Sequence, residues 1–100
     1  MDREYLIKLT SGLYRVTDLF PQDPLKFKIR DRSADILAGL ISPAGSRKNL
    51  LEDINALNTF LDLEKIQNWV DCRNILVLQR EYDRIRREIG QVPENNKVEP

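Results

Sequence analysis

Apolar residues recur three or four positions apart through most of this chain, which is the spacing of one face of an α-helix. The first segment runs from Asp2, a suitable N-terminal cap, to Phe20. Pro21 ends it, because a proline drives the residue before it out of helical geometry. The pattern predicts a first helix over residues 2–20. Its apolar seam consists of Leu6, Leu9, Leu13, Val16 and Phe20.

A second helix is indicated between two links rich in helix-breaking residues. Asp23-Pro24 combines a capping residue with a proline at the first helical position, which is a typical helix start. The run Ser42–Ser46, which contains a proline and a glycine, ends the helix. Its apolar face consists of Leu25, Ile29, Ile36, Leu37, Leu40 and Ile41.

The third helix carries two apolar lines. Asn49 followed by Glu52 has the form of a capping box and predicts its start. The core stripe consists of Leu50, Ile54, Leu57 and Leu61. The second line consists of Phe60, Leu63, Trp69 and Val70. It is a candidate oligomer interface, since aromatic residues are enriched at interface cores; the alternative is a helix end packed against its own bundle.

Asp71 is a plausible cap for the last helix, and Gly90 suits its C-terminal stop. The seam between them consists of Ile75, Leu78, Tyr82, Ile85 and Ile89. Cys72 is expected to pack as a small apolar side chain. Residues 91–100 have no apolar cluster and are expected to form a disordered tail.

Four helical segments with short links predict an all-α fold, an antiparallel up-down-up-down four-helix bundle over residues 1–90. The composition argues against catalysis. The chain has no histidine and one cysteine, which removes the commonest general base and metal ligand and a thiolate zinc cluster. We expect no enzyme, cofactor or metal. The absence of an apolar secretion region or a run of ~20 apolar residues predicts a cytoplasmic protein outside the membrane.

Two basic groups are candidate nucleic-acid contacts in a chain whose 16 basic and 16 acidic residues balance. The start of the second helix carries Lys26, Lys28, Arg30 and Arg32. Their like-charge i,i+4 pairs and their place near a helix N-terminus are locally unfavourable, which favours a function. Partial neutralisation by Asp23 and Asp31 is the alternative.

The second group lies on one face of the last helix and consists of Arg73, Arg80, Arg84 and Arg87. Guanidinium groups bind phosphate through paired, charge-assisted hydrogen bonds. The alternative is a solvated face held by the i,i+4 pairs Asp83–Arg87 and Arg84–Glu88.

A family resemblance rests on several motifs in order along residues 5–90. They are LYRVTDLFP at 13–21, Ile29-Arg30, ADIL at 34–37, Leu40-Ile41, the turn at 69–71 and RIRREIG at 84–90. This layout resembles the four-helix-bundle proteins encoded in intervening sequences of large ribosomal RNA genes. It resembles still more closely the accessory variability determinants of diversity-generating retroelements.

The resemblance implies a homopentameric barrel of four-helix bundles with basic surfaces. Such a scaffold would be non-enzymatic, and would bind template RNA or cDNA and the reverse transcriptase of the element. Two other functions remain open. The neutral charge favours a protein-only adaptor that uses the exposed apolar face of the third helix. A helix-turn-helix DNA reader built from residues 61–89 is less favoured, because the last helix keeps its core seam along its whole length.

Overall fold

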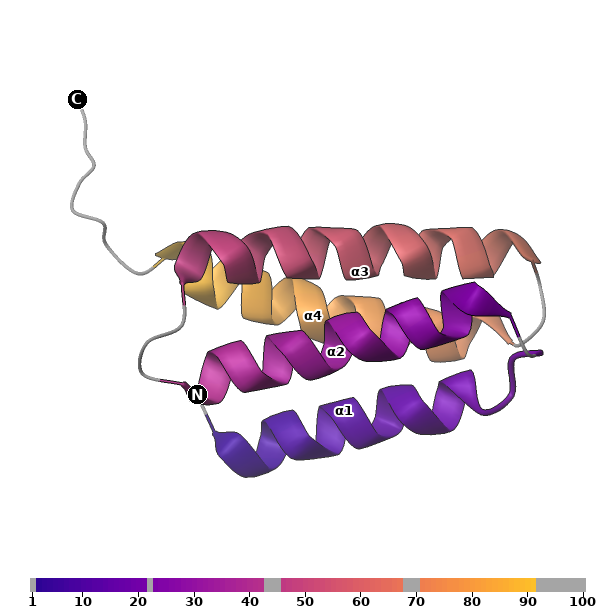
Figure 1. The fold of residues 1–100 in the computed structure, drawn as a ribbon, viewed down its shortest axis with the longest axis horizontal. Helices are drawn as coiled ribbons and strands as arrows, with labels where there is room; N and C mark the ends of the chain where they lie inside the picture. Colours follow the sequence, from indigo (N-terminus) through magenta and orange to yellow (C-terminus); the bar gives the residue numbers. More distant parts are fainter. Residues whose placement is uncertain (1, 22, 43–45, 68–70, 92–100) are drawn as a thin grey trace.

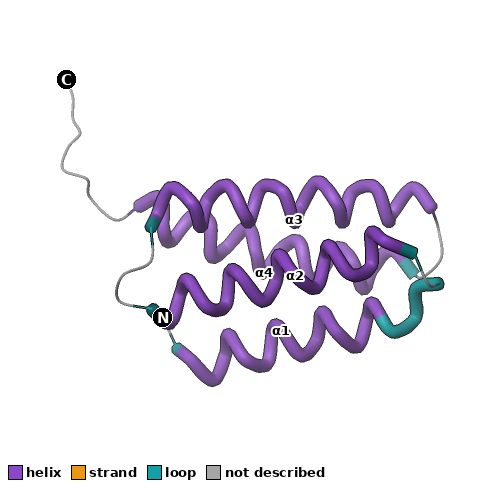
Figure 2. The backbone as a smooth tube through the Cα atoms, in the orientation of Figure 1, coloured by secondary structure: helices purple, strands orange, loops and turns teal. Residues whose placement is uncertain are grey.

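Four α-helices make up the structure. The computed structural model describes residues 2–21, 23–42, 46–67 and 71–91, and within these ranges it contains no strand. The helices are α1 (Arg3–Thr17), α2 (Pro24–Ile41), α3 (Arg47–Gln67) and α4 (Cys72–Gln91). They lie alongside one another in an elongated body (Figure 1; Figure 2). The prediction of an all-α fold with four helices is confirmed.

Each helix packs on two others, in the cyclic order α1, α2, α3, α4. The turn after α1, the start of α2, the end of α3 and the start of α4 lie at the same end of the molecule (Figure 1). We call this end the turn end. Residues that are distant in sequence are therefore brought together there.

Three predicted caps are confirmed by their hydrogen bonds. The Asp2 carboxylate accepts from the Glu4 N–H at 3.0 Å. In the same way, Asp23 accepts from the N–H of Leu25 at 2.7 Å, and Asp71 accepts from the N–H of residue 73 at 2.9 Å. Each aspartate satisfies an N–H group that has no partner within its helix.

Helix α1 ends three residues earlier than its apolar series predicts. The N–H of Leu19 bonds to the Val16 carbonyl, and that of Phe20 to the Thr17 carbonyl. These i→i+3 bonds form a tighter turn than an α-helix. Pro21 excludes helical geometry at Phe20, and the tight turn places the Phe20 ring in the core, where it is 4% exposed.

Two other predicted boundaries are corrected. Helix α3 starts at Arg47, not at Asn49, because the hydroxyl of Ser46 accepts from the Asn49 N–H at 3.3 Å. The predicted capping box is therefore wrong, and a serine upstream serves in its place. Gly90 does not stop α4, which continues to Gln91. The tail predicted from residue 91 onward otherwise lies outside the described residues.

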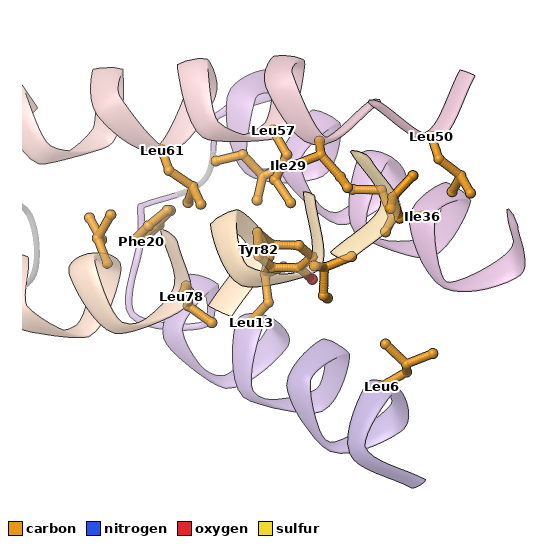
Figure 3. Close-up of a cluster of buried hydrophobic side chains, with 14 residues drawn as sticks. Leu6, Leu13, Phe20, Ile29, Ile36, Leu50, Leu57, Leu61, Leu78 and Tyr82 are labelled. Atoms are coloured by element: carbon orange, nitrogen blue, oxygen red, sulfur yellow. The ribbon is translucent and has the colours of Figure 1, made fainter. Parts of the chain in front are cut away.

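The core runs the length of the bundle and is built mainly from the predicted seams (Figure 3). Ile41, predicted on the apolar face of α2, is instead 47% exposed. Tyr82 lies in the middle of the core, with an exposed fraction of 1%. Its hydroxyl shares a 2.9 Å hydrogen bond with that of Ser33, which is fully buried. Burial raises the pKa of Tyr82. This pair gives two polar groups a partner inside an otherwise apolar core, as buried hydroxyls require.

Gly39 allows a close approach between α2 and α3. A β-carbon at this position would lie 2.6 Å from Cδ2 and 3.3 Å from Cγ of Leu50. Since side-chain carbons in contact are normally 3.5–4.0 Å apart, any other residue at position 39 would require the end of the Leu50 side chain to move.

Candidate nucleic-acid interface

Arg30, one of the predicted contacts, is fixed by helix α1. Its Nε donates to the Thr17 hydroxyl at 2.7 Å, and Nη2 donates to the Tyr14 carbonyl at 3.1 Å. The same Nη2 pairs with Asp18 at 2.5 Å. The guanidinium also lies 4.8 Å from the centre of the Tyr14 ring, within the range of a cation–π contact. With these contacts, Arg30 joins α1 to α2.

The other basic residues of α2 lie in three different settings. Arg32 pairs with Asp53 of α3 at 2.5 Å. Lys26 is buried, with an exposed fraction of 7%. Lys28 is exposed and lines a surface depression of about 340 Å³ together with Asp31, Arg32, Asp35 and Phe60. The repulsion between like charges on α2, which favoured a function for them, is thus offset by two carboxylates. Asp18 at the end of α1 and Asp53 of α3 supply them, and a helix in isolation has neither.

Arg84 of α4 contacts helix α1. It lies 3.6 Å from the Glu81 carboxylate, 3.5 Å from that of Glu88, and 5.5 Å from the centre of the Tyr5 ring. The Tyr5 hydroxyl donates to Glu81. Burial and this hydrogen bond raise the pKa of Tyr5 to about 12. The predicted Arg84–Glu88 pair is present, whereas Asp83 pairs with Arg86 at 3.0 Å.

Arg80 and Arg87 have a different environment. Both are exposed, and neither has a carboxylate partner among the residues that the structure describes. They line one shallow depression of α4, together with Leu76, Gln79 and Asp83. Arg73 lies on the same helix but pairs with Asp71 at 2.6 Å. That contact lowers the pKa of Asp71 to about 2.

The residues of the predicted oligomer interface also differ in their exposure. Phe60 packs partly buried against the core, while Leu63 is 44% exposed. Trp69 and Val70 lie outside the described residues. Ile66, which the sequence analysis missed, is 77% exposed. Its position three residues after Leu63 was the available signal, since residues three apart share a helix face.

Two further exposed residues were also missed. Leu76 is 43% and Val77 is 55% exposed on α4.

Cys72 is exposed, so the expectation that it packs in the interior is wrong. It is the first residue of α4, at a helix end that faces solvent.

The described residues contain no group of three or more His, Cys, Asp or Glu side chains placed to hold a metal ion. Over the same residues, no helix combines the length and the apolar character needed to cross a membrane.

Comparison with known proteins gives no further guide. The chain matches no protein-family model, and no curated protein or solved structure shows significant similarity to it.

Proposed function

We propose that this chain is a non-enzymatic accessory scaffold of a diversity-generating retroelement, which binds template RNA or cDNA and the reverse transcriptase in the cytoplasm. The observation that carries the proposal is the state of Arg80 and Arg87 on α4. Both guanidinium groups are exposed, and the described residues offer them no carboxylate partner. Lys28 is a further exposed cation, on α2.

The spacing of the two arginines suits a phosphate chain. Seven residues of α-helix separate them by about 10 Å along the axis. One strand of B-form DNA carries a phosphate every ~3.4 Å of duplex axis, so the two guanidinium groups are far enough apart to bind separate phosphates. A planar guanidinium can bind each phosphate through two parallel hydrogen bonds.

The family resemblance supplies the assembly for this proposal, which is a homopentameric barrel of up-down-up-down bundles. Contacts between α2 and α3 support alternating helix directions. Arg32 of α2 pairs with Asp53, whereas Gly39, further along α2, lies against Leu50, which is earlier in α3. One helix therefore advances as the other returns.

Replacing Arg80 and Arg87 together with glutamine is expected to weaken binding of a fluorescent 30-nucleotide RNA or DNA by about tenfold or more at low salt. The slope of log K against log salt concentration should fall by about 1.4 for single strands, since each neutralised phosphate contributes about 0.7. Fluorescence anisotropy titrations at several salt concentrations measure both quantities.

The matched control replaces Arg3 and Arg15 of α1, which are also exposed, with glutamine and so removes the same charge. This control should retain most of the affinity and the slope. Equal losses in both double variants would show a response to net charge, and unchanged binding in the α4 variant would show that this face is not the site.

A protein-only adaptor is the second candidate, favoured by the exposed apolar side chains of α3. Leu63 is 44% and Ile66 is 77% exposed, one turn apart near the end of the helix. Apolar patches of this kind on a small protein mark contact surfaces. In the scaffold, the same face would join neighbouring copies.

Light scattering coupled to size-exclusion chromatography distinguishes these two uses. The scaffold predicts a mass five times that of the 11.7 kDa chain, reduced to one chain when Leu63 and Ile66 are both replaced with aspartate, which places charges in the contact. Ile7→Asp, at a 49% exposed position of α1, should leave the mass unchanged. A monomeric wild type would contradict the barrel and leave this face to a different protein.

A further inference from the structure

Glu64 of α3 is a buried carboxyl group, with an exposed fraction of 1%. Among the residues that the structure describes, neither its Oε1 nor its Oε2 has a hydrogen-bond partner. The residue continues the core seam of α3, three positions after Leu61. A carboxylate at such a place costs far more free energy than a protonated carboxyl group, because nothing replaces its hydration.

A second carboxylate lies beside it, at the start of α2. Asp23 Oδ1 caps the helix through the Leu25 N–H, while its Oδ2 is buried and unpartnered. A negative charge is favoured at a helix N-terminus, which is where Asp23 places its carboxylate. Burial first, and then repulsion from Asp23, raises the pKa of Glu64 to about 7.

No nearby cation offsets this arrangement in the described residues. Lys26 of α2 lies three residues after Asp23 and is buried, and it forms no ion pair with Glu64. Several other charged groups near the turn end form ion pairs, whereas Lys28 of α2 is an exposed cation. These pairs are Arg30–Asp18 between α2 and α1, Lys65–Asp62 on α3, and Arg73–Asp71 at the start of α4.

We propose that Glu64 is a proton switch that holds the turn end of the bundle closed while it is protonated and favours its opening as it ionises. In the closed form, the carboxyl group stays in the apolar seam. In the open form, the end of α3 separates from the start of α2 and the carboxylate reaches water. The switch operates between about pH 5 and pH 7 and is independent of the role of the α4 arginines.

Amide hydrogen exchange on the full chain tests the switch. The exchange is followed by NMR between pH 5 and pH 8, and the rates are corrected for the intrinsic exchange rate at each pH. Amides of residues 25–29 and 61–66 should open more often as the pH rises, by roughly 100-fold in total, because each pH unit between the open-state and closed-state pKa contributes up to tenfold. The increase should level off near pH 8. Amides in the middle of α1 should not follow this profile.

Four variants define the origin of the profile. Glu64→Gln and Glu64→Leu should both abolish the pH dependence, and the leucine variant keeps the test valid if a buried amide unfolds the chain. Glu52→Gln, at an exposed position of the same helix, should retain the wild-type profile. Asp23→Asn, which preserves a capping side chain, should reduce the change by removing the repulsion.

Several results would overturn the proposal. One is uniform wild-type protection over this range, and another is a pH dependence that survives in Glu64→Leu. A third is a Glu64 carboxyl ¹³C signal that titrates near pH 4.5. Recovery of protection at pH 8 on adding Ca²⁺ or Mg²⁺ to the wild type, but not to Glu64→Leu, would assign the two carboxylates to a cation site in place of a proton switch.

Discussion

Truncating Leu57 to alanine is expected to lower the free energy of unfolding by about 2–5 kcal/mol, the range for a fully buried leucine. Leu57 has an exposed fraction of 0% and lies in the central part of the core (Figure 3). Removing its branched end deletes apolar contacts and leaves a cavity that the rigid helix backbones only partly close. A domain of this size is stable by about 5–15 kcal/mol in total, so the loss is a large share.

The control for this prediction is Leu19→Ala. Leu19 lies in the turn after α1 and is 63% exposed, so the same atoms are removed from a site already in contact with water. Its effect should stay within about 0.5 kcal/mol. Denaturant unfolding followed by circular dichroism gives both values. A loss below about 1 kcal/mol in Leu57→Ala would mean that the core does not close around this residue.

The wild-type protein is expected to lose stability as the pH rises from about 5 to 7.5. The Glu64 carboxyl has a pKa of about 7 in the folded chain against 4.5 for the ordinary group. The folded state therefore binds more protons than the unfolded state in this window, and the free energy of unfolding falls with pH. At about 1.4 kcal/mol per pKa unit, the loss reaches up to ~3 kcal/mol and is complete near pH 8.

Glu64→Leu is the variant that isolates this effect. It extends the apolar seam by one residue and removes the titrating group, so the slope above pH 5 should disappear and stability at pH 8 should exceed that of the wild type. The lowered pKa of Asp62, caused by hydrogen bonds from Gln79 and then Lys65, acts in the opposite direction at a more acidic pH. Urea unfolding at six pH values gives the profile, and an unchanged slope in Glu64→Leu would contradict the assignment.

Much of the fold follows from the apolar periodicity of the sequence. The errors in the predicted core faces have one physical origin. The core stripe of α3 is confirmed, as is the seam of α4 from Ile75 to Ile89. The face of α2, however, is centred on Lys26, Ile29, Ser33 and Ile36. Two of these four residues are polar, and a search for apolar residues passes over them. Glu64 was missed on α3 for the same reason, although the spacing of three and four residues leads directly to it.

The candidate site could be predicted only in part, because the state of a cation depends on its tertiary neighbours. Sequence spacing places Arg30 and Arg80 in equivalent groups of exposed basic residues. The fold gives Arg30 three partners, from α1 and the residue that caps its C-terminus, and gives Arg80 none among the described residues. Those partners are 12 to 16 positions away along the chain, and no local pattern encodes such a distance.

The close packing of Gly39 against Leu50 has a consequence for the divergence of this sequence. A larger residue at position 39 requires that the Leu50 side chain move aside or that the residue at position 50 become smaller, because the two share one volume. Substitutions at these positions should therefore be coupled across relatives, with a small residue at one site accompanying a large residue at the other. Such a pair would identify distant members of the lineage after the exposed surface has diverged.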